Sequence, residues 1–194
     1  SRIAGNLRLY GLEKQQRVLI FLPNTPQTVI AIWSVVIGDC TCVMTNPLYS
    51  ESELLHQIND SDSKIIITCD LLLSKIKAVL DETKVADVFV VKLSDEEQNY
   101  DDPRIHSWDE LLKDNRGYAC KTINPQTDLA FLQYTGGTTG VSKGCMITHA
   151  NALANCQQVR AMFTKYLFDG QEAFICVLPY FHSYGLMVSV LFPT

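Results

Sequence analysis

The segment YTGGTTGVSKG, residues 134–144, gathers the groups with which proteins bind anions. Its glycines can adopt positive φ and bring backbone N–H groups close to a ligand, because no Cβ atom intervenes. Successive N–H groups in such a turn form a concave site for an anion. Hydroxyl and ammonium donors that suit phosphate come from Thr135, Thr138, Thr139, Ser142 and Lys143. We therefore predict that this segment binds a polyphosphate.

The spacing of this segment excludes two common phosphate loops. A P-loop NTPase requires a lysine directly after its last glycine, followed by a hydroxyl residue for Mg²⁺. Here Val141 and Ser142 separate Gly140 from Lys143, and Gly144 stands where that hydroxyl would be. The dinucleotide pattern G-x-G-x-x-G is also absent. The alternative is a flexible hairpin or linker, but Gly/Ser-rich linkers rarely lie between a buried strand and a capped helix.

The elements around the segment alternate between short apolar runs and helical periodicity. Strands are expected at 17–23, 40–45, 64–68, 85–91, 128–135 and 173–179. Helices are expected at 26–37, 51–60, 70–80 and 107–114, the last with Ser107 as its N-cap. Apolar strands separated by single helices imply an α/β fold, a parallel sheet with helices on both faces. The glycine-rich segment then follows a strand at the carboxyl edge of the sheet, where open α/β sheets bind ligands.

Two further segments flank this pattern. Residues 94–104 are acidic and have no apolar period, so they are expected to form a solvated surface loop. Thr148 is expected to be the N-cap of a long helix with one apolar stripe, formed by Ala152, Val159, Phe163 and Tyr166.

The composition is that of a globular protein and bounds the function classes. The 194 residues are 47% hydrophobic and 19% charged, with a formal net charge of −5. Without a basic stripe, no nucleic-acid partner is expected. No apolar run approaches the ~20 residues needed to cross a bilayer, and no signal peptide is recognised. Residues 1–194 are expected to be part of one domain, truncated at both ends.

The seven cysteines contain no CxxC pair, and no histidine lies at metal-ligand spacing from a second cysteine. Cys42, Cys69 and Cys176 lie in apolar runs, where a free thiol packs as a small hydrophobic group. Reduced cysteines in a cytosolic compartment are the expected state.

The glycine-rich segment resembles the signature of the acyl-adenylate-forming, or AMP-binding, enzymes, which runs approximately Y-T-S-G-T-T-G-x-P-K-G. This chain departs from it with Gly136 for the usual Ser and Ser142 for the usual Pro. The first departure is similar to a variant in bacterial long-chain fatty acyl-CoA ligases. Residues 46–68 (NPLYSESELLHQINDSDSKIIIT) and 178–186 (LPYFHSYGL) resemble two further segments of the family. With three motifs in order over most of its length, the chain is identified as a member of that family.

The resemblance implies a two-step reaction and assigns residues to it. ATP and a carboxylic acid would form acyl-AMP and pyrophosphate, and the acyl group would then pass to coenzyme A. By resemblance, the ATP phosphates are bound by Thr135, Gly136, Gly137, Thr138, Thr139, Gly140 and Lys143. Lys143 would balance charge on the pyrophosphate, and Thr135 would also contact Mg²⁺.

The third motif supplies the residues for the acid. His182 would lie beside the carboxylate and the α-phosphate, with Tyr184 and Gly185 lining the acyl pocket. The alternative for His182 is a helix-start histidine satisfied by the local backbone.

Several nearby residues are expected to be structural. His56 and His149 fall on a polar helix face and at a helix start, and Asn46, Pro47 and Tyr49 are expected to shape a turn. Cys145 has no base beside it in the sequence, so it is not predicted to be a nucleophile.

The resemblance covers only the first part of the family's large N-terminal domain. The family's later residues for Mg²⁺ and ribose, and a C-terminal domain with an adenylation lysine, are outside these 194 residues, so they alone are expected to be inactive. The expected substrate is a medium- or long-chain fatty acid. Three alternatives stay open: a ligase for aryl acids resembling 4-coumarate–CoA ligase, a ligase that acylates a carrier protein, and a non-catalytic nucleotide-binding relative. The expected compartment is the cytosol, with peripheral membrane contact or a peroxisomal site left open for the parent protein.

Overall fold

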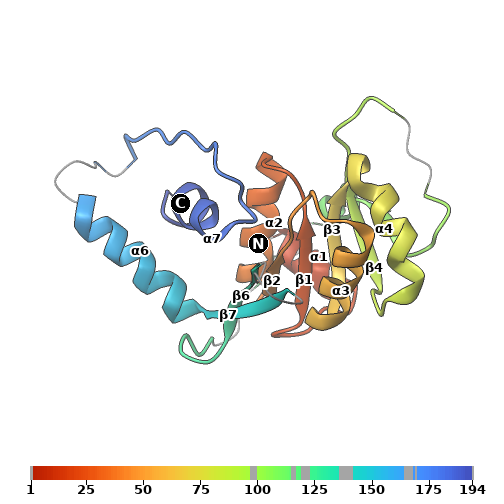
Figure 1. The fold of residues 1–194 in the computed structure, drawn as a ribbon, viewed down its shortest axis with the longest axis horizontal. Helices are drawn as coiled ribbons and strands as arrows, with labels where there is room; N and C mark the ends of the chain where they lie inside the picture. Colours follow the sequence, from red (N-terminus) through yellow and green to blue (C-terminus); the bar gives the residue numbers. More distant parts are fainter. Residues whose placement is uncertain are drawn as a thin grey trace.

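Seven strands form one largely parallel sheet at the centre of the fold (Figure 1). The computed structural model describes residues 2–96, 100–114, 117–118, 123–135, 142–163, 168 and 170–193. The strand order is β5-β4-β3-β1-β2-β6-β7, and only the pair β6 and β7 is antiparallel. The strands are β1 (Arg17–Phe21), β2 (Thr41–Met44), β3 (Ser63–Cys69), β4 (Asp87–Val91), β5 (Ile105–Ser107), β6 (Leu129–Thr135) and β7 (Lys143–Thr148).

Helices cover both faces of the sheet, because strand side chains alternate between two apolar clusters. In β1, Val18 and Ile20 pack in one cluster, and Leu19 and Phe21 pack in the other. The first cluster is completed by α1 (Arg2–Leu9), α2 (Pro26–Ile37) and α5 (Glu110–Lys113), and the second by α3 (Glu51–Ser61) and α4 (Leu73–Val79). The predicted α/β layers are therefore confirmed.

Capping residues set where the predicted helices begin. The Thr25 side chain accepts a hydrogen bond from the Thr28 N–H, and Pro26 occupies the first turn of α2. Ser50 and Glu53 form a reciprocal capping box at the start of α3. The expected helix at 70–80 is also present, as α4 flanked by the 3₁₀ turns Asp70–Leu72 and Leu80–Glu82.

Short elements account for most of the differences from the sequence-based expectations. The elements α1, β5 and β7 were not predicted, and β5 is only three residues long. The helix expected at 107–114 is shorter, Glu110–Lys113, because Ser107 ends β5. The Ser107 hydroxyl still accepts a hydrogen bond from the Asp109 N–H at 3.2 Å. Where residues 94–104 are described, they lie outside helices and strands, as expected.

The strand expected at 173–179 is wrong, because those residues belong to no strand. A strand needs a neighbour that pairs with its backbone N–H and C=O groups. Within the described ranges no strand lies beside this segment, and Ile175 and Val177 are 88% and 76% exposed. Its apolar run therefore does not produce a buried strand here.

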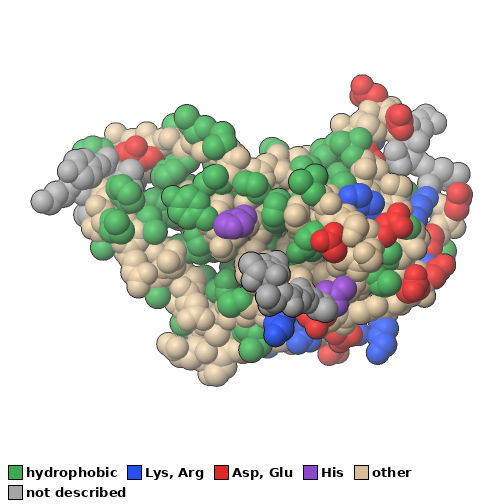
Figure 2. All heavy atoms as spheres, in the orientation of Figure 1, with side chains coloured by type: hydrophobic (Ala, Val, Ile, Leu, Met, Phe, Trp, Pro, Cys, Tyr) green, Lys and Arg blue, Asp and Glu red, His purple; other side chains and the backbone are tan. Residues whose placement is uncertain are grey.

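The expected long helix is present as α6 (His149–Phe163), and the Thr148 hydroxyl accepts a hydrogen bond from the Asn151 N–H at 3.2 Å. Of its expected apolar stripe, Ala152 packs against the first cluster, although no residue described in α6 is buried, and Tyr166 lies outside the described residues. In Figure 2 apolar side chains gather on the α6 and α7 (Ser183–Leu186) side, and charged ones on the α3 and α4 side. In the part of the chain that the structure describes, no helix is long and apolar enough to cross a bilayer.

The cysteines that the structure describes are all free thiols, as expected. Cys40, Cys42 and Cys69 are buried, whereas Cys145 is exposed and Cys156 and Cys176 are half-buried. The core role predicted from the apolar runs therefore holds for Cys42 and Cys69, whereas Cys176 packs against the core while remaining half-buried.

Candidate functional site

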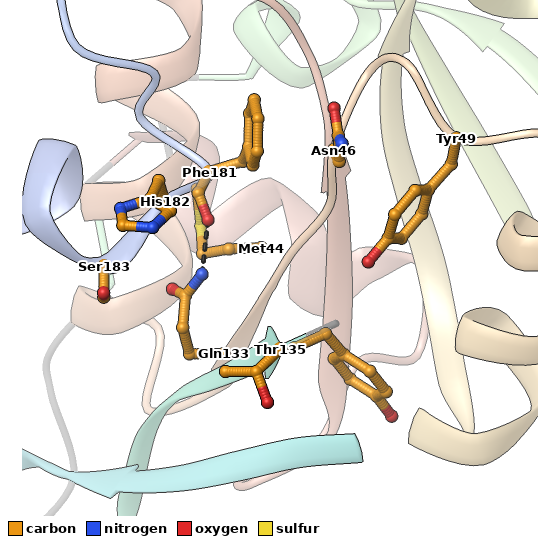
Figure 3. A pocket seen from close by; sticks show the side chains of 9 residues that line it. Met44, Asn46, Tyr49, Gln133, Thr135, Phe181, His182 and Ser183 are labelled. Atoms are coloured by element: carbon orange, nitrogen blue, oxygen red, sulfur yellow. Dashed lines mark hydrogen bonds between the residues drawn. The ribbon is translucent and has the colours of Figure 1, made fainter. Parts of the chain in front are cut away.

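A cavity of about 380 Å³ opens where β2 and β6 end and the segment after Pro179 crosses them. Figure 3 shows Phe181, His182 and Ser183 on one side of it and Asn46 and Tyr49 on the other. Its lining residues are Met44, Asn46, Tyr49, Gln133, Tyr134, Thr135, Phe181, His182 and Ser183. The cavity therefore lies at the carboxyl edge of the parallel strands, where the sequence predicted the site.

Thr135 and Lys143 flank the glycine-rich segment and face each other across two strands. Thr135 is the last residue of β6, Lys143 is the first of β7, and the two are register partners. The Ser142 hydroxyl also donates a hydrogen bond to the Thr135 carbonyl oxygen at 3.2 Å. Both Thr135 and Lys143 are exposed. The other expected phosphate ligands, Gly136, Gly137, Thr138, Thr139 and Gly140, lie outside the described residues.

His182 lines the same cavity as Thr135 and also caps a helix. Its Nδ1 accepts a hydrogen bond from the Tyr184 N–H at 3.3 Å at the start of α7. This bond leaves the proton of the neutral ring on Nε2. The two interpretations of His182 are therefore compatible: one ring nitrogen satisfies the local backbone, and Nε2 can donate to a ligand.

Tyr184 and Gly185 lie away from this cavity. Tyr184 is 61% exposed and lines a second, apolar cavity of about 350 Å³ with residues such as Val159, Phe174 and Val188. Gly185 is buried and lines neither cavity. A Cβ atom at Gly185 would lie 2.1 Å from the Pro179 carbonyl oxygen, so glycine is required there by close packing.

Asn46 and Tyr49 form the turn that the sequence predicted, and that turn is also a wall of the cavity. The Tyr49 N–H donates to the Asn46 carbonyl oxygen at 3.0 Å. Lys75 of α4 fixes the turn from behind, because its Nζ donates to the Tyr49 carbonyl oxygen at 2.7 Å. Tyr49 and Asn46 therefore belong to the site as well as to its support.

The chain resembles known proteins over its whole length. The AMP-binding enzyme family ("AMP-binding enzyme") matches residues 1–194. The chain belongs to the AMP-binding enzyme family. It is 36% identical over 205 residues to a long-chain-fatty-acid–CoA ligase of Bacillus subtilis, covering 95% of this chain and 36% of that protein. The corresponding ligase of Escherichia coli O6:H1 is 34% identical over 201 residues, covering 93% of this chain and 36% of that protein.

Solved structures agree with these relatives. A long-chain-fatty-acid-CoA ligase from Archaeoglobus fulgidus superimposes with a TM-score of 0.82 and 30% identity. The superposition covers 98% of this chain and 36% of that structure. The present AMP-binding chain therefore spans little more than a third of the length of its relatives.

Gln133 of this AMP-binding chain was not predicted from the sequence to support the site. Its Nε2 donates a hydrogen bond to the Phe181 carbonyl oxygen (Figure 3), which ties β6 to the segment that carries His182. Its Oε1 is buried and has no partner within the described residues. The available signal was a glutamine within the apolar run of β6, since a buried amide must be hydrogen-bonded to be tolerated.

The described part of the chain contains no group of three or more His, Cys, Asp or Glu side chains that could hold a metal ion. The Thr135 hydroxyl is a hard oxygen ligand of the kind that Mg²⁺ accepts, together with water and nucleotide phosphates. These donors therefore suit a Mg²⁺ ion that is bound mainly through a nucleotide. They do not suit a metal ion held by protein side chains alone.

Proposed function

We propose that the protein to which this chain belongs is an ATP-dependent acyl-CoA synthetase that activates a fatty acid. The observation that carries the proposal is that Thr135 and His182 line one cavity. The first residue begins the glycine-rich segment, and the second begins the helix beside the apolar cavity. The residues proposed to bind phosphate and carboxylate therefore line one cavity. The ligase names of the relatives support the same reaction class.

The chemistry asked of these residues is positioning and charge stabilisation. A carboxylate oxygen attacks the α-phosphorus of ATP, a P–O bond to the leaving group breaks, and acyl-AMP and pyrophosphate form. Lys143 stabilises the negative charge that develops on the pyrophosphate, and N–H groups of residues 136–140 bind its oxygens. His182 donates through Nε2 to the carboxylate or the α-phosphate oxygen that faces it. The Thr135 hydroxyl would help to hold Mg²⁺, which would supply further neutralisation of phosphate charge when bound.

The acyl chain is assigned to the apolar cavity lined by Tyr184. Val159, Phe163 and Phe174 supply walls suited to hydrocarbon, and Val188 and Phe192 lie on the same surface. Val159 and Phe163 belong to the expected stripe of α6. A chain of methylene groups gains about 0.8 kcal/mol per buried CH₂, so such walls favour a fatty acid over a short polar acid. Coenzyme A is the proposed acceptor in the second step.

The test is pyrophosphate release by the full-length parent protein with ATP and Mg²⁺. Palmitate, octanoate and coumarate are compared, each with and without coenzyme A. We expect release that depends on a fatty acid, and thioester formation only with coenzyme A. A preference for coumarate would indicate an aryl acid as the substrate in place of a fatty acid. Pyrophosphate release that coenzyme A does not affect, with no acyl-CoA formed, would favour a carrier protein as the acceptor. Nucleotide binding without release on any acid would leave a non-catalytic relative and overturn the proposal.

Two variants of the parent separate the proposed roles. Lys143→Ala should slow pyrophosphate formation by about 10²-fold or more, the size of effect seen when one charge-stabilising donor is removed. His182→Ala should reduce adenylation more than it reduces ATP binding. Equal losses in both quantities for His182→Ala would assign it to helix capping alone.

A further inference from the structure

Helix α3 contacts β6 and the residue just before β7, on the two sides of the glycine-rich segment. Nε2 of His56 donates a hydrogen bond to the Ser142 carbonyl oxygen at 2.9 Å. The Asp60 carboxylate accepts a hydrogen bond from the Tyr134 hydroxyl. Because His56 and Asp60 are four residues apart, they lie on the same face of the helix. One helix face therefore holds the residue before Thr135 and the residue before Lys143.

Tyr134 joins the two contacts through its ring. It is the register partner of Gly144, and a Cβ atom on Gly144 would lie 3.0 Å from Tyr134 Cε2 and 3.1 Å from Cζ. The ring thus covers Gly144 closely while its hydroxyl reaches Asp60. Tyr134 is 8% exposed, and burial followed by the hydrogen bond to Asp60 raises the pKa of its hydroxyl. The hydroxyl therefore stays protonated and continues to donate to Asp60.

The sheet alone gives β7 limited support. It is the last strand in the order and pairs only with β6, so its other edge has no strand beside it in the described part of the chain. Lys143, Cys145 and Met146 of β7 are exposed. An edge strand held on one side can shift or fray more easily than a central strand. The contacts from α3 supply a second attachment at the end of β7 that carries Lys143.

We propose that His56 and Asp60 are positioning residues that hold Thr135 and Lys143 in register for binding the phosphates of ATP. The inference rests on the proposed function, because it takes ATP as the ligand of this strand pair. His56, expected from the sequence to be structural, thereby acts on the site through the Ser142 backbone. Neither side chain needs to touch the nucleotide.

The test uses paired variants of the full-length parent. His56→Leu and Asp60→Ala remove the contacts, whereas His56→Gln and Asp60→Asn keep a donor or an acceptor at a similar reach. Asn59→Ala is the matched control, since Asn59 lies on the same helix and donates to the Glu82 carbonyl oxygen at 3.2 Å, away from β7. We expect His56→Leu and Asp60→Ala to weaken ATP·Mg²⁺ binding about tenfold, the scale set by one lost hydrogen bond. The conservative variants should recover most of this loss, and the KM for the acid should stay unchanged.

A second readout follows the strand itself. Hydrogen exchange of the backbone amides in β7 should accelerate about tenfold in His56→Leu and Asp60→Ala and stay at the wild-type rate in Asn59→Ala. ATP binding that is lost without faster exchange would place these side chains at the nucleotide and overturn the inference. Faster exchange with unchanged ATP binding would also overturn it, because the strand would then be held for stability alone.

The two proposals fail in different ways. A wild-type parent that releases no pyrophosphate with any acid refutes the synthetase, while exchange and direct ATP binding still decide the role of α3. A wild-type parent that is active, with variants that match it in ATP affinity and exchange, refutes the role of α3 alone. Thermal unfolding of every variant shows whether a loss reflects global instability: a loss shared with Asn59→Ala counts against the inference.

Discussion

Asn24 binds the backbone around Tyr180 with both ends of its side-chain amide. Its Oδ1 accepts a hydrogen bond from the Tyr180 N–H at 2.9 Å, and its Nδ2 donates to the Leu178 carbonyl oxygen at 2.8 Å. The Asn24 amide therefore hydrogen-bonds backbone groups at the end of the segment 173–179 that a neighbouring strand would otherwise pair with. It fixes the chain just before Phe181 and His182, so a residue in the turn between β1 and α2 helps to place a wall of the cavity.

Asn24→Leu should therefore reduce adenylation more than it reduces stability. The bond to Leu178 is exposed and the bond from Tyr180 is only part-buried, so the free energy of unfolding should fall by no more than about 1 kcal/mol. Displacement of His182 should reduce the rate of acyl-AMP formation by about tenfold or more, because reacting groups tolerate little misplacement. Single-turnover rates and urea titrations of the parent measure the two effects. Asn24→Asp keeps the acceptor for the Tyr180 N–H, so its rate of acyl-AMP formation should lie between those of the wild type and Asn24→Leu. A large loss of stability with little loss of rate would contradict the positioning role.

Gly185→Ala should disturb α7 strongly. The added Cβ would lie 2.1 Å from the Pro179 carbonyl oxygen and 2.8 Å from its carbonyl carbon, both backbone atoms that cannot rotate away. Overpacking of this kind typically costs 1–3 kcal/mol, and here the backbone itself must move, so we expect about 3 kcal/mol. Chemical denaturation measures the loss, and Gly117→Ala serves as a control, since an added Cβ atom there meets nothing within 4 Å and the backbone φ is not positive. Equal losses at the two positions would show that contact with Pro179 is not the cause.

Gly144→Ala tests the packing of the Tyr134 ring against the backbone of β7. The new methyl group meets the Tyr134 ring at 3.0 Å, so the ring must shift and its bond to Asp60 should weaken. We expect destabilisation of about 1–2 kcal/mol in the wild-type background. With Tyr134→Leu as the background, the same substitution should cost much less, because the aromatic edge is gone. Additive effects in this double-mutant cycle would contradict the contact.

His149 should make the protein sensitive to acid. Burial lowers its pKa, an effect that Asp128 and Asp39 oppose, and its Nε2 has no partner among the described residues. A histidine in the unfolded chain has a pKa of ~6.5. As the pH falls below this value, the unfolded state binds more protons than the folded state, so the free energy of unfolding decreases. His149→Gln should lessen the fall in unfolding free energy between pH 7.5 and 5.5, as measured by urea titration. His182→Gln, at an exposed ring, serves as the control, and an unchanged fall in His149→Gln would assign the acid sensitivity elsewhere.

The thiols should divide by burial in their reaction with a thiol reagent. Burial raises the pKa of the Cys40 thiol to about 11 and raises the pKa of the Cys42 thiol well above its usual range. The thiolate is the reactive form, so neither should react at pH 8 while the protein is folded. Cys145, which is exposed beside Lys143, should react first. Mass mapping of the modified peptides measures the order, and early labelling of Cys42 would contradict its place in the core.

The sequence predicted the sheet and its helices well where one local signal determined each element. Thr25 with Pro26 and the Ser50–Glu53 pair determine where α2 and α3 begin, and both starts are as expected. The strand expected at 173–179 failed because pairing, and not the apolar run, decides whether a strand forms. The run contains the right residues but lacks a neighbour in the described part of the chain.

The candidate site was predicted through its motif residues and not through its supports. Thr135 and His182 were expected together, and the structure places both at one cavity. The supports Asn24, Gln133, His56 and Asp60 act through backbone carbonyls or N–H groups, or through a tyrosine hydroxyl, on residues far away in the sequence. Polar residues of this kind carry no periodic signal, so only the tertiary structure reveals them.

The pairing of β6 with β2 has a consequence for how the protein folds. Phe131 lies beside Cys42, whereas β1, β2 and β3 assemble from segments much closer in sequence. Closing so long a loop costs chain entropy before any contact compensates for it, which slows folding. The parts of the cavity lining that come from the turn after β2 and from β6 should therefore meet late. During refolding, compactness should precede nucleotide binding, and the gap between the two phases measures how long β6 takes to join the sheet.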